Sequence, residues 1–165
     1  MALDGHHERV TAAAPDPAAA PAGSILRCTA CGAQARALPT DREPPRCPSC
    51  GAFVPWLVAA LADTFDDEVA VALPVLVDFW AAWCTPCRLV TPMVARAAKE
   101  HAGRLKVVKV NVDRVPEIGD RFKLLTIPSL AVLVGGREVD RVTGAIPPAA
   151  LEDVLAPYLA PLAAP

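Results

Sequence analysis

The sequence predicts an α/β fold in which helices cover both faces of a mixed central sheet, preceded by a small module that needs a cross-link to fold. Two features of the 165-residue chain support this prediction. From residue 55 onward, short apolar segments alternate with helical ones, and a hairpin and a helix close the chain. Residues 24–54 are polar and too few to bury a core of their own, yet they contain four of the six cysteines.

These features divide the chain into three parts. Residues 1–23 are rich in Ala and Pro and have no periodicity, so we expect a disordered tail. Residues 24–54 form the small module, and residues 55–162 form the main domain. Apart from three Cys-x-x-Cys pairs, which we interpret as lacking shared flanks, the sequence suggests no internal repeat.

Local signals place the elements of the main domain. Thr64 precedes three acidic residues, a pattern typical of a helix N-cap. Residues 74–80 form an apolar run interrupted only by Asp78, as in a strand covered on both faces, and Gly135-Gly136 is expected to form a hairpin turn. The expected order is a strand in 56–61, a helix in 64–71, a strand over 74–80, a helix over 85–103, a strand over 105–113, a helix over 115–122, a hairpin over 129–144 and a helix over 147–159.

Composition and charge exclude several classes of function. The formal net charge is −2, which provides no electrostatic basis for binding nucleic acid or an anionic membrane. The longest apolar runs are well short of the ~20 residues that a membrane span requires. The first residues do not resemble a signal peptide, so we expect a cytoplasmic protein. Six cysteines in such a protein favour metal binding or catalysis over structural disulfides.

The pair Cys84 and Cys87 lies where a strand ends and a helix begins. Unpaired N–H groups and the helix dipole stabilise a thiolate at that position and lower its pKa, and a thiolate is the species that attacks disulfides. Pro86 suits a first helical turn because it has no N–H to leave unpaired. Asp78 is an acid within an apolar strand, where burial raises its pKa, and it can accept the proton of a second thiol.

The pairs Cys28–Cys31 and Cys47–Cys50 have the spacing of a four-cysteine metal site. Fifteen residues separate the two pairs, and a glycine follows each pair and permits a tight turn. Four thiolates in a tetrahedron suit one structural Zn²⁺, which would supply the folding energy that the module lacks. Iron in a rubredoxin-like site, free thiols and two disulfides are the alternatives.

Several stretches together resemble the thioredoxin family over residues 56–160. "LVDFWAAWCTPC" is similar to its active-site stretch, "VVKVNVD" to its third strand, and "LLTIPSL" to its loop before a cis-proline. "VTG" is similar to its late glycine, and Pro92 to the proline that kinks its active-site helix. With a four-cysteine zinc ribbon in front, the chain resembles the thioredoxin-2 type of bacterial thioredoxin.

The resemblance implies roles for individual residues. Cys84 would be the attacking thiolate, Cys87 would resolve the mixed disulfide, and Asp78, with Lys109 near it, would take the proton of Cys87. Pro128 would be the cis-proline beside the sulfurs. The substrate groove would comprise Trp83, Thr85, Pro86, Ile127, Pro128 and Gly144. Thr85 departs from the family, which most often has Gly there, so the reduction potential is open.

The resemblance also implies a function and its partners. The protein would reduce disulfides of client proteins and be reduced in turn by a thioredoxin reductase using NADPH, with no organic cofactor of its own. We expect a monomer that binds neither nucleic acid nor membrane. Two alternatives stay open: an oxidant or isomerase of the same fold, and an interaction module in which the zinc ribbon binds a partner and the redoxin fold is a scaffold. The ribbon would modulate the redox pair or sense oxidants.

Overall fold

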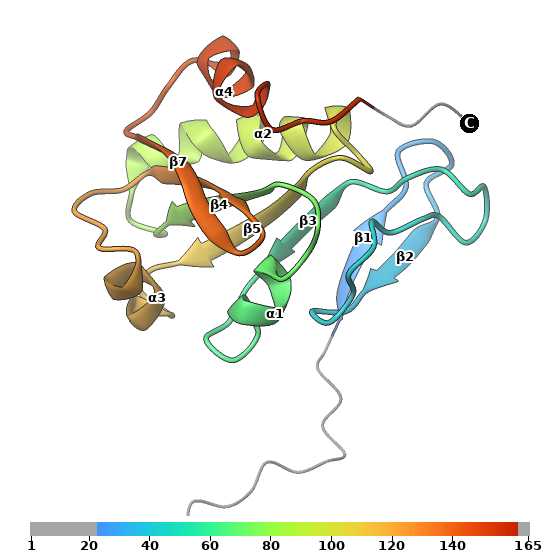
Figure 1. Ribbon diagram of the computed structural model, residues 1–165, viewed down its shortest axis with the longest axis horizontal. Coiled ribbons are helices and arrows are strands. Elements are labelled where there is room, and N and C mark those ends of the chain that lie inside the picture. Colours follow the sequence, from blue (N-terminus) through green and yellow to red (C-terminus); the bar gives the residue numbers. More distant parts are fainter. Residues whose placement is uncertain (1–22, 162–165) are drawn as a thin grey trace, which may run out of the picture.

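A five-stranded mixed sheet forms the centre of the main domain. The computed structural model describes residues 23–161, shown in Figure 1. The strand order is β3-β5-β4-β6-β7. Strands β3 and β4 run parallel to β5, whereas β6 is antiparallel to β4 and β7 is antiparallel to β6. The strands are β3 (Trp56–Ala59), β4 (Val75–Trp80), β5 (Lys106–Asn111), β6 (Ser129–Val134) and β7 (Arg137–Thr143).

Helices cover both faces of this sheet, as the sequence predicts (Figure 1). They are α1 (Phe65–Val69), α2 (Thr85–Glu100), α3 (Pro116–Arg121) and α4 (Pro148–Leu155). Successive strand residues point to opposite faces. In β4, Val77 therefore packs with the core beneath α1 and α3, whereas Leu76 packs with the core beneath α2 and α4. Two hydrophobic layers thus hold β4, the strand that leads into the cysteine pair, on both sides.

The N-terminal module shares the core of the main domain. Its two-stranded antiparallel sheet consists of β1 (Ser24–Arg27) and β2 (Gln34–Ala37) and lies beside the β3 edge of the main sheet (Figure 1). Leu26 and Ala37 are buried in the same apolar cluster as Trp56 of β3. The module is too small to bury its apolar side chains by itself, and it buries part of them by docking against the main domain.

One of two sequence-based helix boundaries is confirmed and the other is wrong. Thr64 holds the N-cap position, but its side chain does not cap α1, because its Oγ1 accepts the Leu61 N–H at 2.9 Å instead. Helix α2 ends at Glu100 rather than at Gly103, and Gly103 lies in the following turn at φ +84°. The backbone of Gly103 thus reverses direction after the helix, in a conformation that other residues rarely adopt.

A buried ion pair joins helix α1 to strand β5 of the sheet. The Lys106 ammonium of β5 is 2.6 Å from the Glu68 carboxylate of α1, and both side chains are buried. The same ammonium lies 4.2 Å from the centre of the Trp56 ring. Burial lowers the pKa of Lys106, and the nearby Glu68 partly offsets this effect. No pattern in the sequence indicates this pair, because the two charges lie in different elements.

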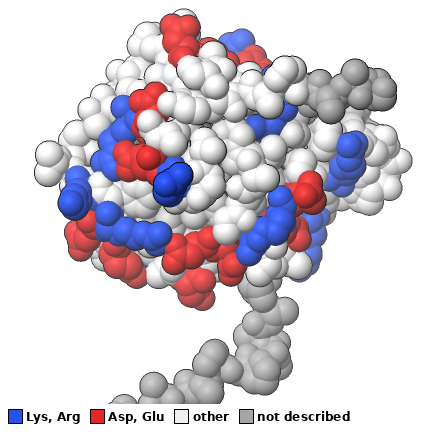
Figure 2. Space-filling model, viewed as in Figure 1, with Lys and Arg blue, Asp and Glu red and all other residues white. Residues whose placement is uncertain are grey.

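Charges of both signs alternate on the surface. Figure 2 shows Lys and Arg side chains interspersed with Asp and Glu, and neither sign forms a continuous field on this face. Such a surface agrees with the net charge of −2. Among the helices of residues 23–161, none is long and apolar enough to cross a membrane.

Candidate redox site and metal centre

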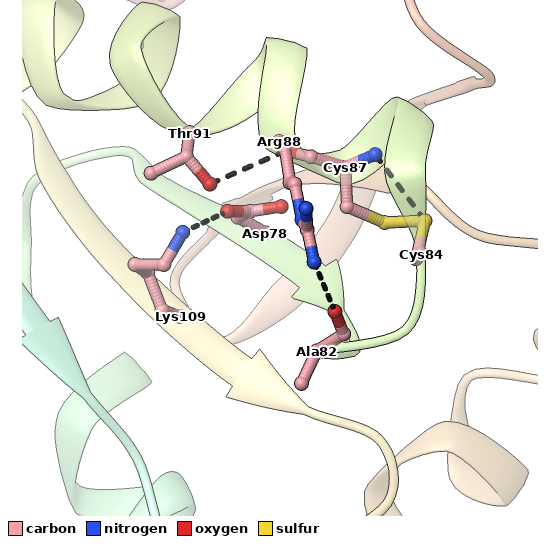
Figure 3. Close-up of a disulfide and its surroundings, with 7 residues drawn as sticks. All are labelled: Asp78, Ala82, Cys84, Cys87, Arg88, Thr91 and Lys109. Atoms are coloured by element: carbon pink, nitrogen blue, oxygen red, sulfur yellow. Dashed lines mark hydrogen bonds and ion pairs between the residues drawn. A yellow bond between two sulfur atoms is a disulfide. The ribbon is translucent and has the colours of Figure 1, made fainter.

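Cys84 and Cys87 form a disulfide at the start of α2 (Figure 3). Cys84 is the N-cap residue in extended conformation, and its Sγ accepts the backbone N–H of Cys87 at 3.2 Å. Both cysteines are buried, whereas Thr85 and Pro86 between them are exposed. A backbone N–H that points at Sγ, at the positive end of a 16-residue helix, favours the thiolate form of Cys84 once the disulfide is reduced.

Asp78 lies beneath the first turn of α2. Its Oδ2 accepts a hydrogen bond from Lys109 Nζ at 2.6 Å, and Figure 3 shows the carboxylate between Lys109 and the disulfide. Burial raises the pKa of Asp78, although the charge of Lys109 partly offsets the increase. The second oxygen, Oδ1, is buried and has no hydrogen-bond partner among the described residues. A carboxyl group with a raised pKa and a free oxygen near a thiol is suited to take up and release a proton.

The loop before β6 contributes the other side of the redox site. The Ile127–Pro128 peptide bond is cis, and the Pro128 carbonyl accepts the Gly144 N–H at 2.8 Å. Trp83 is 68% exposed beside the disulfide. Ile127 and Trp83 line one hollow of about 430 Å³.

Of the six residues expected in the substrate groove, only Trp83 and Ile127 line this hollow, together with residues that the motifs did not include. The hollow that holds Trp83 and Ile127 is also lined by Val112, Pro116, Gly119, Asp120, Leu124, Leu125 and Thr126. Leu125 is 99% exposed, which is unusual for a leucine. Leu124 and Leu125 stand in the quoted "LLTIPSL" stretch, but nothing in the sequence indicates which of its leucines is exposed.

The four remaining cysteines form a single cluster. All four sulfurs lie within 4.8 Å of one another, with Cys28 Sγ 3.7 Å from Cys50 Sγ and Cys31 Sγ 3.5 Å from Cys47 Sγ. A tetrahedron with metal–sulfur distances of about 2.3 Å requires sulfur–sulfur distances of roughly 3.8 Å. Four sulfurs at this spacing fit a tetrahedral metal ion, and they are too far apart for disulfides.

The two halves of this cluster are a repeat, so the expectation of unrelated flanks is wrong for these pairs. Residues 27–33 read Arg-Cys-x-x-Cys-Gly-Ala, and so do residues 46–52. In both, the first cysteine N–H bonds to the alanine carbonyl at 2.8 Å, and the glycine N–H bonds to the first cysteine carbonyl at 2.9 Å. Gly32 and Gly51 adopt φ of +77° and +75°. We call each such turn a knuckle.

The cysteines of the cluster differ in acidity. Backbone hydrogen bonds, the largest from Cys50, lower the pKa of Cys47 to about 6. A backbone hydrogen bond from Ala33 lowers the pKa of Cys31, but the combined effect of neighbouring sulfurs and burial raises it to about 12. The cluster therefore keeps protons at neutral pH that a bound cation would displace.

Glu100, His101 and Glu152 are a second group of possible metal ligands, but they take part in an ion-pair network. His101 Nε2 lies 2.7 Å from Glu152 Oε2, and Arg96 bonds to Glu100. Arg104 Nη2 lies 3.1 Å from His101 Nδ1. Because arginine can only donate, Nδ1 is the acceptor and Nε2 carries the proton that Glu152 accepts. These contacts already use the groups that would bind a metal.

Comparison with known proteins identifies the family. The sequence model of the thioredoxin family matches residues 56–157, which is more than half of the chain. The chain belongs to the thioredoxin family. Thioredoxin 1 of Nostoc sp. is 45% identical over 97 residues, which cover 58% of this chain and 91% of the relative. Thioredoxin 1 of Chlorobaculum tepidum is 50% identical over 88 residues, covering 53% and 87%. The chloroplastic M-type thioredoxin of Chlamydomonas reinhardtii is 40% identical over 98 residues, covering 59% and 70%.

This thioredoxin is a thiol–disulfide oxidoreductase, a protein-disulfide reductase whose redox-active disulfide is Cys84–Cys87. The matched region begins after the four-cysteine module. A module of this kind ahead of the domain is the arrangement expected for the zinc-ribbon-containing thioredoxin-2 type. The predicted fold class is confirmed as well, with a thioredoxin fold behind a two-stranded sheet that carries four clustered cysteines.

Proposed function

We propose that Cys84 is the attacking group and Cys87 the resolving group in the reduction of client disulfides. The Cys84 thiolate attacks one sulfur of the client disulfide, which forms a mixed disulfide and releases the other client sulfur as a thiolate. Cys87 then attacks Cys84 Sγ and releases the second client sulfur. Two electrons pass from the cysteine pair to the client, and the pair ends as the disulfide of Figure 3.

The single observation that supports this order best is the hydrogen bond at the helix start. Cys84 Sγ accepts the Cys87 N–H and occupies the N-cap, so Cys84 is the sulfur whose negative charge the helix stabilises. Asp78 serves the other cysteine in this proposal. Its partnerless Oδ1 takes the Cys87 proton when Cys87 attacks, and Lys109 stabilises the carboxylate while it is ionised.

The residues around the disulfide, of which Trp83, Thr85 and Pro86 are exposed and Pro128 is buried, would bind the client segment. We propose that it lies along Trp83, Thr85, Pro86, Ile127, Pro128 and Gly144. Two observations support this proposal: Trp83 and Ile127 share one hollow, and the Gly144 N–H bonds to the Pro128 carbonyl. The apolar lining suits an extended client segment with apolar side chains.

One structural zinc ion in the four-cysteine cluster is the second part of the proposal. The sulfur spacing, the glycine turns and the four thiolate ligands that the described residues bring together support zinc. Bound zinc would hold the module, which we place at residues 24–54, against the thioredoxin domain, which we place at residues 55–162. Residues 1–23, which we predict to be a disordered tail, lie almost entirely outside the described residues.

The remaining assignments follow from the chemistry of the site. A reductant must be regenerated after each cycle, and we propose a thioredoxin reductase that draws on NADPH. We also propose a cytoplasmic monomer that takes part in cell redox homeostasis. A reducing compartment suits both a dithiol reductant and four thiolates kept available for metal.

Trapping the mixed disulfide tests the proposed roles of the two cysteines. In a Cys87→Ser variant, attack still occurs but resolution does not, so a covalent adduct with insulin should accumulate. A Cys84→Ser variant should form no such adduct. Mass spectrometry after acid quenching distinguishes the two variants. An adduct through Cys87 in the Cys84→Ser variant, with none in the Cys87→Ser variant, would reverse the assigned roles.

A further inference from the structure

Each knuckle is closed by an arginine that stands directly before its first cysteine. Arg27 Nη1 donates to the Gly32 carbonyl at 3.1 Å, and Arg46 Nη1 donates to the Gly51 carbonyl at 3.1 Å. In both knuckles the accepting glycine directly follows the second cysteine. The backbone register matches too, since Arg27 pairs with Gln34 and Arg46 pairs with Phe53. The same side-chain contact thus recurs in two turns that are far apart in the sequence.

We propose that Arg27 and Arg46 are positioning residues for the metal ion, and that they hold it in place by geometry and by charge. This inference rests on the proposed metal site. Each guanidinium ties the glycine turn back to the residue before the first cysteine, and so fixes the separation of the two sulfurs in its knuckle. Residues that orient metal ligands commonly matter for affinity almost as much as the ligands themselves.

The charges of the two arginines act independently of the turn geometry. Four thiolates around one divalent cation leave two negative charges in excess. Two guanidinium groups, one at each knuckle, offset these charges, and arginine keeps its charge at every physiological pH. Arg42, also in the module, is instead engaged by Asp67 of α1 at 2.9 Å, so it serves docking rather than the knuckles.

The two arginines are not equally constrained. The Arg46 guanidinium lies 3.9 Å from the centre of the Phe53 ring, a cation–π contact that fixes its orientation. No described aromatic ring makes such a contact with Arg27. A side chain that is already held loses less freedom when it bonds. Loss of Arg46 should therefore weaken metal retention more than loss of Arg27.

Metal release from the full-length, zinc-loaded protein tests the proposal. The readout is the rate at which zinc passes to a colorimetric chelator, with the redox disulfide left intact. We expect release to be about tenfold faster for Arg27→Gln and faster still for Arg46→Gln. Arg36→Gln is the matched control, because Arg36 is an exposed arginine of β2 with no hydrogen bond to either knuckle. It should release zinc at the wild-type rate.

Lysine variants separate charge from general damage to the fold. Arg27→Lys and Arg46→Lys keep the charge, so they should release zinc more slowly than the glutamine variants. Equal rates for Lys and Gln variants, or glutamine variants that match Arg36→Gln, would overturn the proposal. The metal content of the wild-type protein is measured first. It distinguishes failure of the proposed metal site from failure of the proposed role of the arginines. A wild type that binds no zinc refutes the metal site itself, whereas a zinc-loaded wild type with insensitive variants refutes only the role of the arginines.

Discussion

The Asp78 carboxylate and the Lys109 ammonium lie 2.6 Å apart on neighbouring strands, with the carboxylate between the ammonium and the disulfide (Figure 3). Asp78 is 1% exposed and Lys109 15%, so the acid is the more deeply buried partner. The net effect of burial and pairing is that the pKa of Asp78 is raised. The protein thus keeps an acid near the redox pair that is costly to ionise, as expected of a group retained for proton transfer rather than for stability.

Replacement of Asp78 by Asn should slow catalysis and stabilise the fold at neutral pH. The variant cannot accept the Cys87 proton, so resolution of the mixed disulfide should slow by about tenfold or more at pH 7. The free energy of unfolding should rise by roughly 1 kcal/mol or more, because a carboxylate that is costly to bury is removed while the partly exposed Lys109 ammonium keeps contact with water. Stopped-flow kinetics and urea denaturation measure the two effects. Slower resolution together with lower stability would contradict this account.

The gain in unfolding free energy that we expect for Asp78→Asn should depend on pH. A carboxyl group whose pKa is higher in the folded than in the unfolded state favours folding at low pH, and this contribution is lost as the pH rises through the folded-state pKa. Wild type and Asp78→Asn should therefore have similar stabilities below about pH 4 and diverge above it. Denaturation at several pH values checks the divergence. A gain that is constant across pH would show that ionisation of Asp78 is not its cause.

The buried pair of Glu68 and Lys106 should show strong coupling. Lys106→Met leaves the Glu68 carboxylate buried without a partner, which should cost about 3–5 kcal/mol of unfolding free energy. Glu68→Leu should be similarly costly, while the double variant should lie close to wild type. A double-mutant cycle by urea denaturation gives the coupling energy. Additive single-variant losses would mean that the two charges do not depend on each other.

Gly103 is expected to tolerate no side chain. Its φ is +84°, and a Cβ there would lie 2.6 Å from the ring of Phe53. Gly103→Ala should lower the unfolding free energy by roughly 2 kcal/mol. Gly119→Ala is the control, because Gly119 lies within α3 and a Cβ there makes only ordinary contacts. The unfolding free energy of this variant should be unchanged or slightly higher than that of the wild type. Equal effects of the two substitutions would refute the packing argument.

Removal of the metal should destabilise the whole chain rather than the module alone. Leu26 and Ala37 of the module share one apolar cluster with Trp56 and Phe79 of the thioredoxin domain. We expect chelation to lower the melting temperature by more than about 5 °C in a single transition. Calorimetry with and without chelator measures the shift. An unchanged main transition would show that the two parts fold independently.

Local patterns account for what the sequence predicted correctly. The strand over 75–80 is apolar except for Asp78 because two helical layers cover it, and Cys84–Cys87 is recognisable because strand, motif and helix are contiguous in the chain. Gly135-Gly136 likewise marks its hairpin locally. Such features need no knowledge of tertiary contacts.

The features that sequence reasoning missed depend on tertiary contacts or on a comparison between knuckles. Glu68 and Lys106 meet only after α1 packs against β5, and Leu125 is exposed only because of the loop conformation. The shared core arises from docking of β1 beside β3. The Arg-Cys-x-x-Cys-Gly-Ala repeat, in contrast, was present in the sequence and becomes evident when Arg27 and Arg46 are compared.

The reduction potential of the Cys84–Cys87 couple tests the central claim most directly. It is measured by equilibration with dithiothreitol or glutathione redox buffers, with zinc content followed in parallel. A disulfide reductase should have a potential near about −270 mV, as thioredoxins do, and exposed Thr85 would then be a neutral variation. A value of about −180 mV or higher would place the protein among isomerases and oxidants and would contradict its role as a reductant.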